Sequence, residues 1–206
     1  MKIHTLVLGD LQTNCYIWAD EGTGNAIVVD VPDSADKIID FADKNGLKIT
    51  DIILTHGHFD HMLGLAELKE KTGAELSVFE KTVDFINEKN LNLGFHMGVE
   101  CPIAEADRIL KDGDEIDFHG NKIRVIHTPG HTADSICLLL DDTLISGDTL
   151  FRRSVGRWDF PTGDMYKEIA SIKEILFKLP DETVVYPGHG AATTIGEERR
   201  GNPYAV

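Results

Sequence analysis

The residues best suited to chemistry in this sequence stand in one short segment, Thr55 to His61, which reads Thr-His-Gly-His-Phe-Asp-His. It directly follows an apolar run that is typical of a β-strand. In extended backbone, residues two apart point to the same side, so His56 and His58 can converge on one ion. Asp60 and His61 follow where a helix begins, and the turn redirects them toward a neighbouring position. The segment therefore predicts metal binding, with two adjacent ion sites within reach.

A chance cluster of histidines in a solvent-exposed loop is the alternative interpretation, and the composition weighs against it. With nine His among 206 residues, three His and one Asp at set places arise in roughly two of a thousand chains. A closed structural zinc site usually needs four ligands, often with Cys among them, whereas this loop offers only His and Asp. The residue types therefore favour a catalytic metal site over a structural one.

Further ligands are expected where other strand-like segments end. Three candidates follow apolar segments and have glycine beside them: His131, Asp148 and His189. Glycine permits a close approach of the backbone and unusual dihedral angles, which a crowded metal site requires. Taken singly, each candidate also has a plainer interpretation, because a loop His is commonly exposed and Gly-Asp is a common turn.

The elements that must position these residues alternate between strand and helix. Aliphatic runs predict strands at 26–31, 52–54, 76–79, 115–118, 122–127, 136–140, 143–146 and 183–186. One apolar stripe predicts a helix that Asp164 caps, and it consists of Met165, Ile169, Ile172, Leu176 and Leu179. The segment from Gly196 to Val206 is expected to form a polar tail. This order favours an α/β sandwich of two packed sheets with outer helices.

Length, charge and composition limit the remaining classes. A chain of 206 residues predicts a single domain, 1–206. Lys and Arg number 20 and Asp and Glu number 35, a net charge of −15 that repels phosphate backbones and disfavours nucleic-acid binding. No apolar stretch approaches the roughly 18 residues that span a bilayer, and no secretory signal is expected. Cys15, Cys101 and Cys137 are an odd number, which favours a reducing cytoplasm.

The candidate ligands occur in the order His-x-His-x-Asp-His, a later His, a later Asp and a final His. With this pattern the sequence resembles the metallo-β-lactamase superfamily over nearly its whole length. The resemblance implies the αββα sandwich of two mixed β-sheets flanked by helices. It also implies the ligand sets: His56, His58 and His131 for a first metal ion, Asp60, His61 and His189 for a second, and Asp148 as the bridge between both. His and Asp ligands suit zinc, iron and manganese alike, and two zinc ions are our expectation.

Within that superfamily the sequence is most similar to glyoxalase II, or hydroxyacylglutathione hydrolase, in its short bacterial form. The likeness lies in segments 128–132, 146–151, 156–160, 196–199 and 202–203. It implies hydrolysis of S-D-lactoylglutathione or a related small acyl-thiol by a hydroxide that bridges the two ions. Asp60 would be both a ligand and the catalytic group that orients the hydroxide. Class B β-lactamases commonly lack this Asp and have Cys in place of Asp148, so antibiotic hydrolysis is not expected.

The long form of glyoxalase II has a C-terminal helical substrate domain, which we do not expect in this chain. The acyl-thiol is then expected to bind loops around 151–159 and 92–101 and the tail. Candidate contacts are Phe151, Arg152, Arg157 and Arg199, together with Arg153. The same arginines can instead pair with acidic groups, and Arg157 with Asp159 stays open between the two roles. The sequence does not determine the thiol carrier, the acyl group or the oligomeric state.

Two other functions remain open. Persulfide dioxygenases share the Gly-Arg-x-Asp-Phe segment and hold one iron with residues that match His56, His58 or its neighbour, His131 and Asp148. That family typically has Pro-Ala-His-Asp where this chain has Tyr-Pro-Gly-His-Gly at 186–190, which favours the hydrolase. A non-catalytic metal-binding protein is the second alternative, and the complete ligand set weighs against it.

Overall fold

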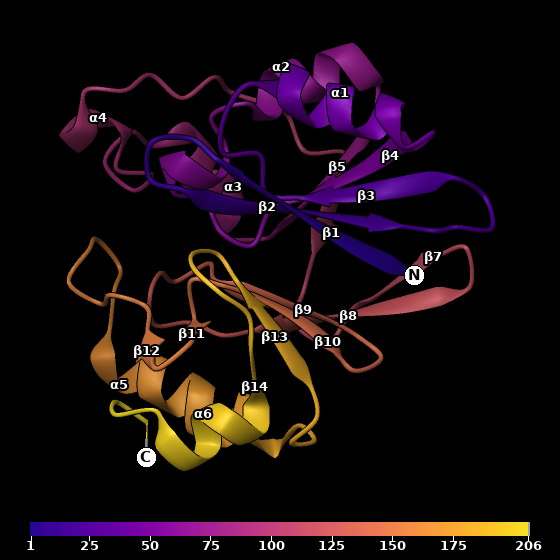
Figure 1. Ribbon diagram of the computed structural model, residues 1–206. Coiled ribbons are helices and arrows are strands. Elements are labelled where there is room, and N and C mark those ends of the chain that lie inside the picture. Colours follow the sequence, from indigo (N-terminus) through magenta and orange to yellow (C-terminus); the bar gives the residue numbers. More distant parts are fainter. Residues whose placement is uncertain (206) are drawn as a thin grey trace. The chain divides into compact units, whose positions relative to one another are not determined.

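A computed structural model describes residues 1–205. The chain divides into two compact units, Met1–Leu110 and Lys111–Val206. Each unit has one six-stranded mixed β-sheet with helices on it (Figure 1). Each sheet contains parallel neighbours, and the ends of these strands position the residues of interest.

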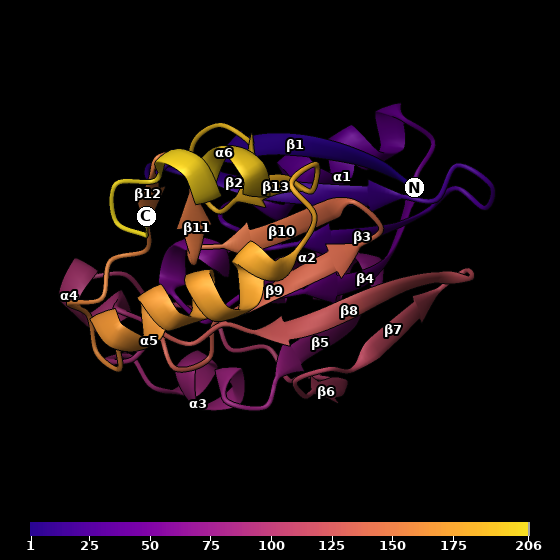
Figure 2. The same cartoon turned by 90° about the horizontal axis from the view of Figure 1, so that it is seen from below.

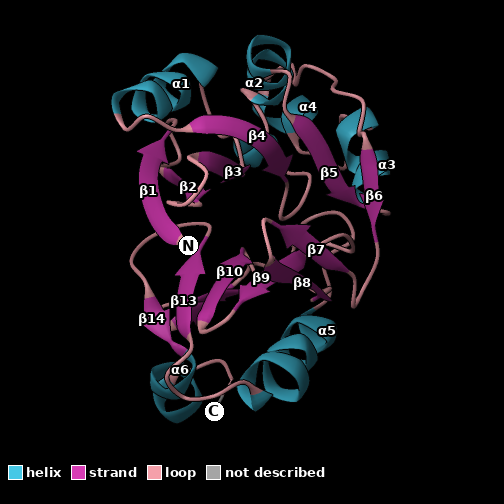
Figure 3. Cartoon of the chain, turned by 90° about the vertical axis from the view of Figure 1, so that its right-hand side faces the viewer, coloured by secondary structure: helices cyan, strands magenta, loops and turns pink. Residues whose placement is uncertain are grey.

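The sheet of the first unit follows the order of the chain, β1 to β6. Its strands are β1 (Lys2–Leu8), β2 (Thr13–Ala19), β3 (Asn25–Val29), β4 (Lys48–Ile53), β5 (Glu75–Phe79) and β6 (Arg108–Leu110). The first three pair antiparallel, and β3 to β6 pair parallel. The helices are α1 (Ala35–Lys44), α2 (Leu65–Thr72), α3 (Thr82–Asn87) and the single turn α4 (Gly94–Met97). Figure 3 shows α1, α2 and α3 along one side of the curved sheet.

The core of the first unit lies between this sheet and its helices. Ile38 of α1 and Leu65 of α2 pack in one cluster with Ile52 of β4, and all three are fully buried. Burying one such side chain stabilises the folded state by about 1.5–3 kcal/mol. Because β4 is fixed on this face by several of these contacts, the loop that follows it starts from a rigid position.

The sheet of the second unit has the order β14-β13-β10-β9-β8-β7. Its strands are β7 (Glu115–Phe118), β8 (Asn121–His127), β9 (Ile136–Leu140), β10 (Thr143–Gly147), β13 (Val184–Pro187) and β14 (Thr193–Thr194), and β11 (Leu150–Phe151) pairs with β12 (Ser154–Val155). All neighbours are antiparallel except β10 and β13. Figure 2 shows the helices α5 (Met165–Ala170) and α6 (Ile195–Gly201) of this unit. Ile172 and Ile195 belong to the apolar cluster that packs with the sheet.

Every strand that the sequence predicts is present, with bounds that differ by a few residues. The structure adds the short strands β6, β11, β12 and β14. It also adds β1 and β2, where polar residues such as His4, Thr13 and Asn14 interrupt the apolar pattern. Both faces of β2 are buried, so its sequence does not show the alternation that marks a strand with one exposed face.

The predicted helix over 165–179 is not one regular α-helix. Asp164 caps it as predicted, accepting hydrogen bonds from the backbone N–H of Tyr166 and Lys167. The α-helix then ends at Ala170 and continues as a π-helical segment, Ser171–Ile175, and a 3₁₀ turn, Leu176–Lys178. The buried face also differs from the predicted stripe, because Met165 is 41% exposed whereas Glu168 is fully buried.

The prediction of a polar tail after Gly196 is wrong for most of that segment, which forms α6. The Thr194 hydroxyl caps this helix by accepting from the Glu197 N–H, and the buried Ile195 anchors its first turn. Glu197 in the first turn and Arg200 in the last turn also suit the helix dipole. Val206 lies outside the described residues.

Among residues 1–205, no helix has both the length and the apolar character needed to cross a membrane.

The three cysteines are free thiols and differ in burial. Cys15 and Cys137 are fully buried, and burial raises the pKa of the Cys137 thiol to about 12 and that of Cys15 well above its usual range. Partial burial also raises the pKa of the Cys101 thiol, but less than full burial raises the other two. Only the thiolate reacts with alkylating agents. We therefore expect iodoacetamide at pH 8 to label Cys101 alone in the folded protein, as counted by mass spectrometry. Three labels are expected in denaturant, and labelling of a folded Cys101→Ser variant would contradict this prediction.

Candidate metal centre

The histidine-rich segment leaves the first sheet directly after β4. Because β3 and β4 are parallel neighbours, the residues that follow them, Asp30 and Thr55, lie at the same edge of the sheet. The Asp30 carboxylate accepts hydrogen bonds from the Thr55 N–H and from the Thr55 hydroxyl, each at 2.8 Å. Asp30 has a φ of 62°, a left-handed conformation that Asp tolerates better than most residues. This buried carboxylate therefore fixes the first residue of the segment.

The same carboxylate also contacts His61 and bears on the tautomer of its ring. Asp30 Oδ2 lies 2.8 Å from His61 Nδ1, and both side chains are buried. With this oxygen as the acceptor, Nδ1 carries the hydrogen and Nε2 is the nitrogen that can bind a metal ion. His61 Nε2 lies 3.7 Å from Asp60 Oδ2, and the Thr13 hydroxyl donates to that same oxygen at 3.2 Å.

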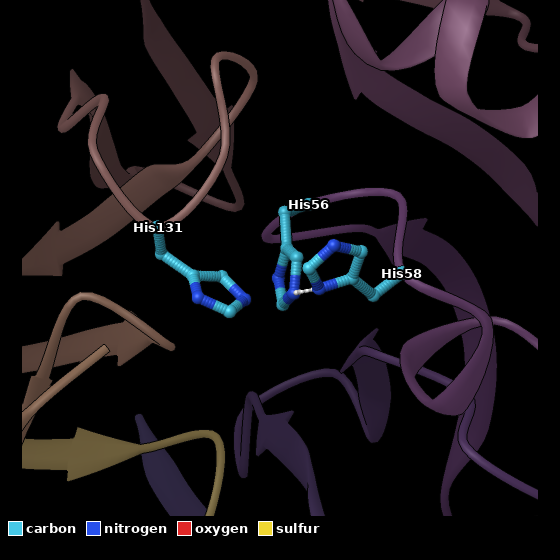
Figure 4. A group of neighbouring side chains, drawn as sticks. All are labelled: His56, His58 and His131. Atoms are coloured by element: carbon cyan, nitrogen blue, oxygen red, sulfur yellow. Dashed lines mark hydrogen bonds between the residues drawn. The ribbon is translucent and has the colours of Figure 1, made fainter. Parts of the chain in front are cut away.

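His56 and His58 point toward one another, as the extended spacing predicted (Figure 4). His56 Nε2 and His58 Nδ1 are 3.2 Å apart. Two nitrogen ligands at 2.0–2.1 Å from a tetrahedral zinc ion are separated by roughly 3.3 Å. The Thr55 hydroxyl lies 3.1 Å from His56 Nδ1 and can accept its hydrogen, because it donates its own to Asp30. The ring nitrogens of this pair therefore have the spacing of ligands to one ion.

The second unit brings its three predicted ligands together in a similar way. β10 and β13 are its parallel neighbours, so Asp148 and His189 follow them at the same edge of the sheet. Asp148 Oδ2 lies 3.5 Å from His189 Nε2 and 3.7 Å from His131 Nε2. His131 Nδ1 donates to the Arg157 carbonyl at 2.7 Å, which leaves the lone pair on Nε2. Two imidazole nitrogens thus face one carboxylate.

Sequence reasoning missed three side chains that support these ligands: Thr13, Asp30 and Glu168. Glu168 is fully buried and accepts from the His131 N–H at 2.7 Å. Burial raises its pKa to about 9, the charge of Asp148 adds to this shift, and backbone N–H donors oppose it. None of the three stands within a recognisable motif, and an acidic residue on a predicted buried helix face was the one available signal for Glu168.

The predicted substrate contacts lie in the second unit and differ in their partners. The Phe151 ring lies 6.3 Å from the His189 ring, and Arg152 is exposed. Arg157 forms a two-pronged ion pair with Asp159 at 3.0 and 2.8 Å, which lowers the pKa of that carboxyl. Arg199 binds the Asp181 carboxylate together with the carbonyls of Phe177 and Leu179.

All seven predicted ligands offer an atom to groups of side chains that fit a metal ion. Imidazole and carboxylate are ligands for several divalent metals, so the donor set fits such ions without selecting one. A divalent ion held by such carboxylates and imidazoles, which lie 3.2–3.7 Å apart, would lower the pKa of a water bound to it. The chemistry that such an arrangement supports is metal-assisted hydrolysis.

Comparison with known proteins also indicates a metal-dependent hydrolase. The model of the metallo-beta-lactamase superfamily matches residues 8–189. Hydroxyacylglutathione hydrolase GloC of Haemophilus influenzae is 32% identical over 99% of this chain and 98% of its own length. This chain therefore has relatives among the hydroxyacylglutathione hydrolases.

Solved structures resemble the whole chain as well. The BLEG-1 B3 metallo-beta-lactamase superimposes with a TM-score of 0.95 and 30% identity, over 100% of both chains. ETHE1 from Myxococcus xanthus gives 0.83 and 32%, over 100% of this chain and 84% of that one. TTHA1623 in a di-iron-bound form gives 0.87 and 32%, over 98% and 99%. The expected fold of mixed sheets flanked by helices is confirmed, and the chain belongs to the metallo-β-lactamase superfamily.

Proposed function

We propose that this protein is a dinuclear metal-dependent thioester hydrolase that cleaves S-D-lactoylglutathione or a related small acyl-thiol. The observation that supports the proposal is the spacing of the candidate ligands within each unit, which is 3.2–3.7 Å between ligand atoms and suits binding to a common ion. The similarity to GloC over the full chain supports the substrate class. Such a substrate places a carbonyl carbon next to a thiolate leaving group, which departs without a general acid.

The proposed ligand assignment divides the seven side chains between two divalent ions, most simply zinc. His56, His58 and His131 bind the first ion, Asp60, His61 and His189 bind the second, and Asp148 binds both. When bound, the ions supply Lewis-acid activation of the water and of the thioester carbonyl. Asp60 is the group we propose to orient the attacking water, and Thr13 supports this role because its hydroxyl fixes Oδ2 of that carboxylate.

For substrate contacts we propose first Phe151, beside His189, and the exposed Arg152. Arg157 and Arg199 remain candidates for a substrate carboxylate, but each would have to exchange a partner. Arg157 would leave Asp159, and Arg199 would leave Asp181. The existing ion pair of Arg157 supports the structural role for this residue.

We also propose that the protein works in the cytoplasm on small molecules rather than on nucleic acids. Three free thiols agree with a reducing compartment. A net charge of −15 opposes binding to phosphate backbones.

Metal analysis combined with two assays tests the function. About two divalent ions per chain, with release of free thiol from S-D-lactoylglutathione, are expected for the purified protein. The second candidate is a mononuclear-iron persulfide dioxygenase, which the likeness to ETHE1 keeps open. The di-iron-bound form of TTHA1623 is the observation that favours iron as the metal, although that protein holds two ions. One iron per chain, no thiol release and oxygen consumption with glutathione persulfide would replace our proposal with that function. Metal without turnover of either substrate would favour a non-catalytic binding protein.

A further inference from the structure

A single carboxylate in α5 holds two segments of the second unit. Glu168 is fully buried, its Oε2 accepts the His131 N–H at 2.7 Å, and its Oε1 accepts the Gly156 N–H at 3.1 Å. A buried carboxyl group, charged or neutral, is costly for the folded state unless its oxygens are hydrogen-bonded. Both oxygens of Glu168 are, and both donors belong to the backbone around one imidazole.

One of these two hydrogen bonds is made to the backbone of His131, and the other is made next to the residue that contacts its ring. The first fixes the backbone from which the ring projects. The second fixes Gly156, and the next residue, Arg157, offers the carbonyl that accepts from His131 Nδ1 at 2.7 Å. Glu168 is therefore bonded to the backbone from which the ring projects and to the residue that precedes the carbonyl contacting Nδ1. The other nitrogen, Nε2, lies 3.7 Å from Asp148.

The packing around Glu168 leaves little freedom for this arrangement. A Cβ added at Gly130 would lie 2.2 Å from Glu168 Cα, and one at Gly156 would lie 2.8 Å from Glu168 Oε1. The same helix contacts the loop twice more, since the Asp164 N–H donates to the Gly130 carbonyl and the Ser171 hydroxyl donates to the Pro129 carbonyl, both at 2.8 Å. The helix thus holds the 129–131 loop along its length, and Glu168 is the contact that bears on His131 itself.

We propose that Glu168 is a positioning residue for metal binding, which orients His131 through its backbone N–H and, by way of Gly156, through the Arg157 carbonyl. The inference rests on the proposed function only in taking His131 as a metal ligand. Residues that orient ligands commonly change metal affinity by 10–100-fold when they are replaced.

The test compares Glu168→Gln with Glu198→Gln. Glu198 is a matched control because it is also a fully buried carboxylate of the second unit and accepts from the Arg153 N–H, the Thr193 hydroxyl and the Asn202 amide. Glutamine keeps the volume but turns an NH₂ group toward one of the backbone donors. We expect about 10–100-fold weaker zinc binding in Glu168→Gln, measured by chelator competition, and a change below about threefold in Glu198→Gln.

A second readout is independent of zinc and of any substrate. Nitrogen NMR of the metal-free protein reports which ring nitrogen of His131 carries the hydrogen. We expect Nδ1–H in the unchanged protein and in Glu198→Gln, and a mixture of tautomers in Glu168→Gln. The inference would be overturned if the two variants bound zinc equally well, or lost zinc affinity to the same extent, while His131 kept the same tautomer in both. If Glu168→Gln does not fold, Glu168→Asp, which retains the carboxylate, is compared in the same way. Absence of zinc binding in the unchanged protein would defeat the proposed function, and the tautomer comparison would still decide the role of Glu168.

Discussion

Replacing Asp148 by alanine is expected to lower kcat/KM for thioester hydrolysis by about a thousandfold and to reduce the metal content from two ions to about one. In the proposed assignment this carboxylate is the one ligand shared by both ions. A metal ion that polarises a carbonyl contributes several kcal/mol to transition-state stabilisation. Since about 1.4 kcal/mol is a tenfold change in rate, the loss of one ion corresponds to roughly three powers of ten. Elemental analysis and steady-state kinetics on the same preparation measure both effects.

Asp142→Ala is the matched control for this change. Asp142 is an exposed residue at the turn between β9 and β10, the strand that precedes Asp148. We expect its replacement to leave metal content and kcat/KM within about twofold, because exposed substitutions away from a site are usually close to neutral. A folded Asp148→Ala protein that keeps two ions and more than a tenth of the activity would contradict the assignment of Asp148.

The local part of the metal centre could be predicted from the sequence because its geometry follows from short spacings. Residues two apart in extended backbone share a side, and His56 and His58 do place ring nitrogens 3.2 Å apart. The position of Asp148 and His189 after apolar runs was also readable, since each follows one of two parallel strands. The sequence did not show that the two residues lie at the same edge of the sheet, because β13 pairs with β10 only after the intervening helix.

The supporting residues could not be predicted because tertiary register brings them to the ligands. Asp30 reaches His61 across 31 positions of sequence through the parallel pairing of β3 and β4. Thr13 reaches Asp60 across 47 positions from the start of β2, a strand that the composition did not reveal. Nothing local to either residue distinguishes it from an ordinary polar side chain at the end of a strand.

Glu168 is an intermediate case. It stands three residues after Met165 and four before Ile172, so helical spacing places a carboxylate on the face that was expected to be apolar. In the structure the carboxyl group occupies the buried face of the helix, since Glu168 is buried and Met165 is exposed. An acidic residue on a helix face that is predicted to be buried therefore indicates a hydrogen-bonding role. The apolar residues around it make this indication easy to overlook.

Removal of the metal ions is expected to lower the melting temperature by roughly 10 °C. An ion that binds the folded chain but not the unfolded one, at a free concentration of a thousand times its Kd, stabilises the fold by about 4 kcal/mol. For a chain of this size, 1 kcal/mol corresponds to about 2–4 °C. Calorimetry before and after treatment with a chelator, followed by restoration of zinc, measures the shift.

Two histidine variants identify the source of that shift. His56→Ala removes a proposed ligand that is fully buried, whereas His96→Ala changes an exposed histidine of α4 that has no proposed contact with metal. We expect chelation to shift the melting temperature of His96→Ala as much as that of the unchanged protein, and to shift that of His56→Ala by less than half. Equal shifts in both variants would mean that the stabilising ion binds elsewhere, because a site that uses His56 cannot keep its affinity without that imidazole.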